Sequence, residues 1–194
     1  PRAPRVLGDI DSRTSDAASR SWWDSEADEY HREHGGFLGS DSPGGEFVWG
    51  PERLREADVH LLGDIVDRDI LEIGCGSAPC SRWLATHGAR PVGLDLSHRM
   101  LAHGLVTMAR FDEPRVPLIQ ATAESLPFAD ESFDIAFSSF GAVPFVADPA
   151  GVMAEAARVI KPGGRWVFSV NHPMRWMFPD DPGPAGLTVT MPYF

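Results

Sequence analysis

A glycine-rich turn follows a short apolar run in the middle of the chain. The run Asp69–Ile73 leads into Gly74 and Gly76, and Pro79 stands where it can open a helix. Glycine lets a backbone turn tightly and approach a ligand closely, and a helix N-terminus presents unpaired N–H groups. The pattern predicts a nucleotide-like ligand at this turn, although a tight strand-to-helix connection without a ligand has the same signature.

A carboxylate, Asp95, ends a second apolar run about twenty residues past the glycines, where an acid can accept hydrogen bonds from both ribose hydroxyls. It also stands two positions before Ser97, so a place in the N-terminal cap of the next helix is the alternative. Dinucleotide enzymes usually have a third glycine, but Pro79 occupies that position. The residues favour a nucleotide-like cofactor and weaken the case for hydride transfer.

Short apolar runs alternate with amphipathic ones from Asp69 onward, which is the pattern of βαβ units. We expect a doubly wound α/β fold, with a mostly parallel sheet and helices on both faces. The predicted strands cover residues 69–73, 91–95, 116–121, 133–138 and 165–170, and the predicted helices cover 79–87, 97–109 and 149–160.

The N-terminal part of the chain differs in character from this region. Residues 1–20 are polar and lack periodicity, so we expect a flexible arm. Apolar positions at Trp23, Ala27 and Tyr30 predict a helix over residues 21–34, and a second helical pattern opens at Pro51. Residues 21–68 would form a helical lid, and residues 69–194 the main domain.

Composition narrows the possible partners. The chain has 17 Lys and Arg against 28 Asp and Glu, a net charge of −11 that would repel a phosphate backbone. There is no apolar run of membrane-spanning length, so we expect a cytoplasmic protein without a membrane partner. Cys75 and Cys80 lack a second pair, which indicates reduced thiols and no metal site.

Five segments in order resemble class I S-adenosylmethionine-dependent methyltransferases, in particular the type 11-like small-molecule enzymes. They cover residues 71–76, 93–100, 120–128, 132–136 and 158–164. The resemblance implies a Rossmann-like domain that binds S-adenosylmethionine and methylates a small-molecule acceptor by in-line displacement. These enzymes usually end in a further antiparallel strand hairpin, and the sequence after residue 170 offers little to form one. A domain truncated at its C-terminus would have this pattern.

The resemblance also implies a role for individual residues. Asp95 would hold the ribose, while Leu96 and Met100 would sandwich the adenine, with helix packing as the alternative for Met100. Relatives commonly have Asp where this chain has Thr122, which accepts a hydrogen bond only through its hydroxyl. The implied cofactor-binding residues are Glu72, Gly74, Cys75, Gly76, Asp95, Leu96, Met100, Thr122, Ala123, Glu124 and Ser138.

The sequence assigns no catalytic residue firmly. His172 follows the last predicted strand, and Tyr30 lies on the predicted lid, so both are candidates for a base near the acceptor. A solvated or locally bonded ring is the alternative for His172. A methyltransferase acting on protein or RNA, and a non-catalytic nucleotide-binding module of the same fold, are the competing hypotheses for function.

Overall fold

The computed structural model describes residues 11–36, 39–179 and 184–192. Five parallel strands form one sheet in the order β3-β2-β1-β4-β5. The strands are β1 (Asp69–Ile73), β2 (Arg90–Asp95), β3 (Leu118–Gln120), β4 (Phe133–Ser139) and β5 (Ile160–Ser169). The helices are α1 (Ser12–His34), α2 (Glu56–Val59), α3 (Pro79–Thr86), α4 (His98–Arg110) and α5 (Pro149–Val159), with 3-10 turns η1 (Val143–Phe145), η2 (Pro173–Met177) and η3 (Pro184–Leu187).

The two faces of the sheet are covered by different helices, which confirms the predicted α/β architecture. Because side chains alternate along a strand, Leu71 and Ala136 join one apolar cluster with Val152 and Ala156 of α5. Ile70 and Phe137 face the other way and pack with α3 and with residues 47–62. Burial on both sides explains why these strands read as continuous apolar runs.

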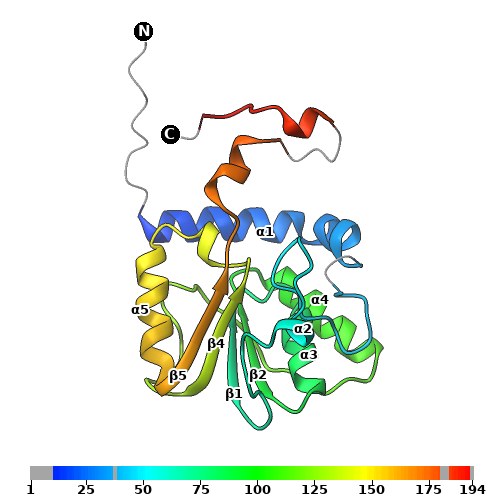
Figure 1. Ribbon diagram of the computed structural model, residues 1–194, viewed down its shortest axis with the longest axis vertical. Helices are drawn as coiled ribbons and strands as arrows, with labels where there is room; N and C mark the ends of the chain where they lie inside the picture. Colours follow the sequence, from blue (N-terminus) through cyan, green and yellow to red (C-terminus); the bar gives the residue numbers. More distant parts are fainter. Residues whose placement is uncertain (1–10, 37–38, 180–183, 193–194) are drawn as a thin grey trace.

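The order of the strands indicates where a ligand site lies in this fold. The chain winds outward from β1 through β2 to β3, then returns to pair β4 on the other side of β1. At such a switch point the connections diverge and leave a crevice beyond the carboxyl ends of the strands. Helix α1 lies across these ends, as Figure 1 shows, so it forms a roof over the crevice.

Two predictions for the N-terminal region were wrong. Residues 12–20 of the expected flexible arm belong to α1, which starts early because the Asp11 side chain accepts a hydrogen bond from the Thr14 N–H at 3.1 Å and caps the helix. Residues 1–10 lie outside the described part of the chain. The helix expected from Pro51 shrinks to α2, because the buried Glu56 carboxylate binds the N–H groups of Leu61 and Leu62 and folds the segment into a loop.

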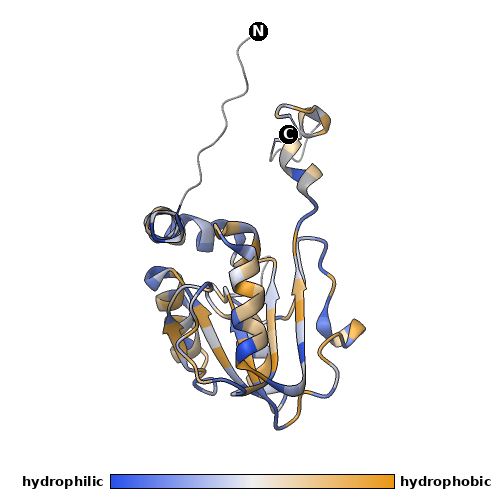
Figure 2. Ribbon diagram, turned by 90° about the vertical axis from the view of Figure 1, so that its left-hand side faces the viewer, coloured by the Kyte–Doolittle hydropathy of each residue, from blue (hydrophilic) through white to orange (hydrophobic). Residues whose placement is uncertain are grey.

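The C-terminal part also departs from expectation. Strand β5 begins at Ile160, five residues before the predicted Arg165, because the turn after α5 pairs with β4 through a register shift. After Ser169 the described residues form 3-10 turns and loops and add no strand to the sheet. Figure 2 shows this segment rising away from the sheet, whose strands carry much apolar colour. Among the described helices, none has the length and apolar character needed to cross a membrane.

Candidate functional site

The crevice between α1 and the carboxyl ends of β1, β2 and β4 is a cleft that gathers most of the predicted site residues. It also receives side chains from α1, part of which the sequence predicted as a lid, and from η1, which the sequence did not connect to the site. The predicted residues that line it are Tyr30, Glu72, Gly74, Cys75, Gly76, Asp95, Leu96, Met100, Thr122 and Ala123.

The glycine turn closes the floor of the cleft with positive backbone angles. Gly74 has φ +77° and Gly76 has φ +55°, conformations that side chains disfavour. A Cβ on Gly74 would lie 2.5 Å from the Ala142 backbone nitrogen. The turn is held to β2 because the N–H groups of Gly74 and Cys75 both donate to the Leu94 carbonyl. This backbone therefore forms a fixed cradle.

Asp95 is fastened to that cradle by two backbone donors. Its Oδ2 accepts from the Gly76 N–H at 2.7 Å, and its Oδ1 accepts from the Ser97 N–H at 2.8 Å. Burial raises the pKa of Asp95, and these N–H groups work in the opposite direction. The cap of α4 is Ser97, whose hydroxyl accepts from the Met100 N–H, so Asp95 is not the N-cap residue. Its carboxylate lines the cleft.

Glu72 is buried beneath the cleft and is bound to α3. Its Oε2 accepts from the Ser81 N–H at 2.9 Å and from the Ser81 hydroxyl. Burial raises the pKa of Glu72 to about 8, against the effect of those Ser81 contacts. The side chain is therefore mostly neutral at pH 7. Burial also raises the pKa of the Cys75 and Cys80 thiols well above the usual value, so neither is an activated nucleophile.

The apolar wall of the cleft comes from α4 and from the loop after β3. Met100 is 6% exposed, and its methyl carbon would lie 3.2 Å from a Cβ placed on Gly76. Leu96, Thr122 and Ala123 complete this wall. The Thr122 hydroxyl accepts from the Glu124 N–H at 3.3 Å, so the hydroxyl already has a local partner.

Three predicted site residues do not line the cleft. Ser138 is fully buried, and Ser139 lines the cleft instead, because alternation along β4 sends the two side chains to opposite faces. The Glu124 carboxylate is turned to the Asp148 N–H, at 2.9 Å. His172 is exposed, and its Nδ1 accepts from the Met174 N–H as the cap of η2.

One face of α1 forms the roof of the cleft. Asp16, Ser19, Trp23 and Tyr30 all line the cleft, and their spacing of three, seven and fourteen residues puts them on one helical stripe. Trp23 meets Tyr30 at 5.4 Å and Phe145 of η1 at 5.6 Å between ring centroids, both edge-on. The sequence did not reveal Asp16 and Ser19 as site residues, because the polar first turns of α1 show no apolar period.

A second, polar stripe of α1 holds the roof to α4. Asp24 accepts from the Ser97 hydroxyl at 2.6 Å, and Asp28 accepts from His103 Nε2 at 2.9 Å and pairs with Arg99. His31 stacks on His103 with ring centroids 4.2 Å apart. The roof is therefore docked mainly by charge, hydrogen bonds and ring stacking.

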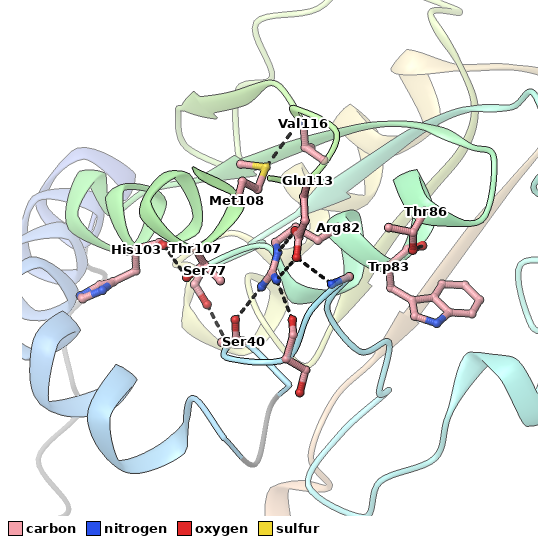
Figure 3. A network of polar contacts seen from close by, with 12 residues as sticks. Ser40, Ser77, Arg82, Trp83, Thr86, His103, Thr107, Met108, Glu113 and Val116 are labelled. Carbon is pink, nitrogen blue, oxygen red and sulfur yellow. Dashed lines mark hydrogen bonds and ion pairs between the residues drawn. The ribbon is translucent and has the colours of Figure 1, made fainter. Parts of the chain in front are cut away.

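A buried ion pair anchors the loop that follows α1. Arg82 of α3 is 1% exposed, and its Nε and one terminal nitrogen each lie 2.7 Å from an oxygen of Glu113. The guanidinium also donates to the carbonyl of Ser40, which Figure 3 labels, and to that of Ser42. The Ser40 hydroxyl meets the Ser77 hydroxyl at 2.8 Å, which links this loop to the glycine turn.

Comparison with known proteins agrees with this geometry. A family described as a methyltransferase domain matches residues 71–168. Demethylmenaquinone methyltransferase from Tropheryma whipplei is 36% identical over 126 residues, which are 64% of this chain and 51% of that protein. Ubiquinone biosynthesis O-methyltransferase from Alkalilimnicola ehrlichii is 30% identical over 176 residues, which are 90% of this chain and 65% of that protein.

Solved structures point the same way. An S-adenosylmethionine-dependent methyltransferase from Mesorhizobium loti superposes with a TM-score of 0.55 and 33% identity, over 63% of this chain and 55% of that one. The chain spans about half the length of the first curated relatives that it matches. The matched residues run from Leu71 within β1 to Phe168 within β5 and include the glycine turn and Asp95. The chain therefore belongs to the methyltransferase domain family.

Proposed function

We propose that this chain binds S-adenosylmethionine in the cleft under α1 and transfers its methyl group to a small-molecule acceptor. The observation that carries the proposal is the placement of Asp95 on the glycine turn, inside a fold of the methyltransferase domain family. The names of two relatives refer to demethylmenaquinone and to ubiquinone biosynthesis, so they suggest small acceptors without agreeing on one.

The residues of the cleft fit the cofactor part by part. Asp95 retains oxygen lone pairs beyond its two backbone contacts, as the two hydroxyls of a ribose require. Leu96 and Met100 present an apolar surface for a flat base. Gly74 and Gly76 have no side chain, so the methionine part of the cofactor can approach their backbone closely.

When bound, S-adenosylmethionine supplies a methyl group that is already electrophilic because it is attached to a sulfonium sulfur. The chain then has to orient the acceptor and exclude water. Trp23, Tyr30 and Phe145 cover the cleft on the side of α1 and η1. Burial raises the pKa of Tyr30, so its phenol stays protonated at neutral pH and acts as a hydrogen-bond donor rather than as a base.

The test is calorimetric titration with S-adenosylmethionine, its demethylated product S-adenosylhomocysteine, and NAD. We expect micromolar binding of the two sulfur ligands, no binding of NAD, and loss of binding in Asp95→Ala. Asp58→Ala is the matched control, because Asp58 is an exposed acid outside the cleft. Binding of NAD in preference to the sulfur ligands, or unchanged affinity in Asp95→Ala, would overturn the proposal.

A further inference from the structure

The described lining of the cleft has acidic side chains and no basic ones. Among the described residues that line it, three are acids, namely Asp16, Glu72 and Asp95, and none is Lys, Arg or His. Two of the acids already have their partners in the fold, because Glu72 is bound by Ser81 and Asp95 by the Gly76 and Ser97 N–H groups. Because Asp95 is proposed to hold the ribose of the cofactor, Asp16 is the carboxylate that remains for the acceptor.

Asp16 lies one helical turn before Ser19, whose hydroxyl donates to the Phe145 carbonyl at 3.4 Å. Within the described part of the chain, no hydrogen bond or ion pair engages its carboxylate. Trp23 is the next residue on this stripe after Ser19, and Phe145 meets it edge-on. Aromatic rings attract a cation at their faces, and a carboxylate pairs with it directly. Together these groups suit a ligand that carries a positive charge next to an apolar body.

We propose, on the basis of the methyltransferase function above, that the acceptor is an amine, held as its ammonium by Asp16 and the aromatic side chains Trp23 and Phe145. A phosphorylated or carboxylate acceptor would meet the Asp16 carboxylate, and no Lys, Arg or His among the described lining residues would offset that charge. The net charge of −11 would attract cations at long range.

The absence of an imidazole from the described lining of the cleft also favours an amine over a phenol or alcohol. A hydroxyl acceptor needs a base in place as it attacks, whereas an amine needs only to release one proton to water beforehand. The nitrogen lone pair then forms the N–C bond while the S–C bond breaks and its electron pair stays on sulfur. The positive charge moves from sulfur to the methylated nitrogen, where the Asp16 carboxylate would offset it.

Two probes of equal shape distinguish the effect of a ligand's charge on its affinity from the effect of its size. Choline and its neutral carbon analogue 3,3-dimethylbutan-1-ol would each be titrated by NMR into protein saturated with S-adenosylhomocysteine. We expect choline to bind at least about fivefold more tightly, as a cation–π contact and a carboxylate contact imply. Asp16→Asn should remove most of that preference and leave the affinity for the neutral analogue unchanged.

Glu29→Gln is the matched control, since it makes the same carboxyl-to-amide change on an exposed part of α1. Equal binding of the two probes, or an unchanged preference in Asp16→Asn, would overturn the amine proposal while leaving methyl transfer intact. Weaker binding of S-adenosylhomocysteine in Asp16→Asn would also overturn it, because Asp16 would then serve the cofactor. Failure of S-adenosylhomocysteine to bind the unsubstituted chain would instead contradict the proposed function itself.

Discussion

The Asp95 carboxylate accepts the backbone N–H of Gly76 at 2.7 Å, so the acid that ends β2 also fixes the turn that follows β1. One residue thus ties the ribose-binding position to the glycine cradle. Because Asp95 has both roles, its substitution by alanine and its substitution by asparagine should have different effects.

Asp95→Asn keeps one acceptor oxygen, whereas Asp95→Ala removes both and frees the turn. We expect Asp95→Ala to lower affinity for S-adenosylhomocysteine by about a hundredfold or more, and Asp95→Asn by about tenfold, because each lost charge-assisted hydrogen bond is worth about 1.5–3 kcal/mol. Calorimetry measures both, with circular dichroism as the check on folding. Equal losses in the two variants would show that only the charge matters.

Gly74→Ala should abolish cofactor binding. The added Cβ would lie 2.5 Å from the Ala142 nitrogen, and φ +77° is strained for alanine. The control is Gly163→Ala, since Gly163 has φ +79° and a Cβ added there would have nothing within 4 Å. We expect both variants to lose about 1 kcal/mol of stability through strain, and only Gly74→Ala to lose more and to fail in titration. An unchanged affinity of Gly74→Ala for the cofactor would contradict the role of the glycine turn as a cofactor-binding cradle.

The Arg82–Glu113 pair should dominate the stability of the loop after α1. Arg82→Met leaves the buried Glu113 carboxylate without its cation, and we expect a loss of about 3–5 kcal/mol in the free energy of unfolding. Urea denaturation measures the loss. Arg53→Met, which alters a more exposed arginine on Glu46, should cost about 1 kcal/mol or less. Similar losses in both variants would contradict a special role for the buried pair.

Docking of α1 should weaken in acid. Burial and the neighbouring His103 lower the pKa of His31, against the effect of Asp41. The folded state therefore favours neutral His31, so this stabilisation is complete above the ordinary pKa of 6.5 and decreases as the pH falls below it. Asp28, on the other side of His103, and Arg82 are the further charges near this ring pair.

Hydrogen exchange of α1 at pH 5.5 and 7.5, corrected for the intrinsic exchange rate, measures this docking. We expect protection to be several-fold lower at the acid pH, and His31→Gln to remove most of that difference because it cannot gain a proton. An equal pH response in His31→Gln would show that protonation of His31 does not cause the effect.

Substitution by alanine should affect the stability of the protein differently at Ser138 and at Ser139. The buried Ser138 hydroxyl has no hydrogen-bond partner in the described part of the chain, whereas Ser139 donates to the Val48 carbonyl at 2.5 Å. We expect Ser138→Ala to leave the stability unchanged or raise it by up to about 1 kcal/mol, and Ser139→Ala to lower it by about 1 kcal/mol. Thermal unfolding compares the two. A marked loss of cofactor affinity in Ser138→Ala would restore the predicted role of Ser138.

The sequence by itself determined the local patterns of this protein. The apolar run Asp69–Ile73, the glycines after it and Asp95 at the end of the next run are short-range signals, because a strand, a turn and a helix N-terminus each depend on neighbours in the chain. These signals predicted the sheet, three of the helices and ten of the residues that line the cleft.

Only the tertiary structure decided which side chains share the cleft. Asp16 joins it because the Asp11 cap starts α1 early and α4 holds that helix across the strand ends. Ser138 is excluded because alternation along β4 turns it away, and His172 because β5 carries it to an exposed turn. Contacts between residues far apart in the chain depend on packing direction, which composition and spacing along the sequence do not encode.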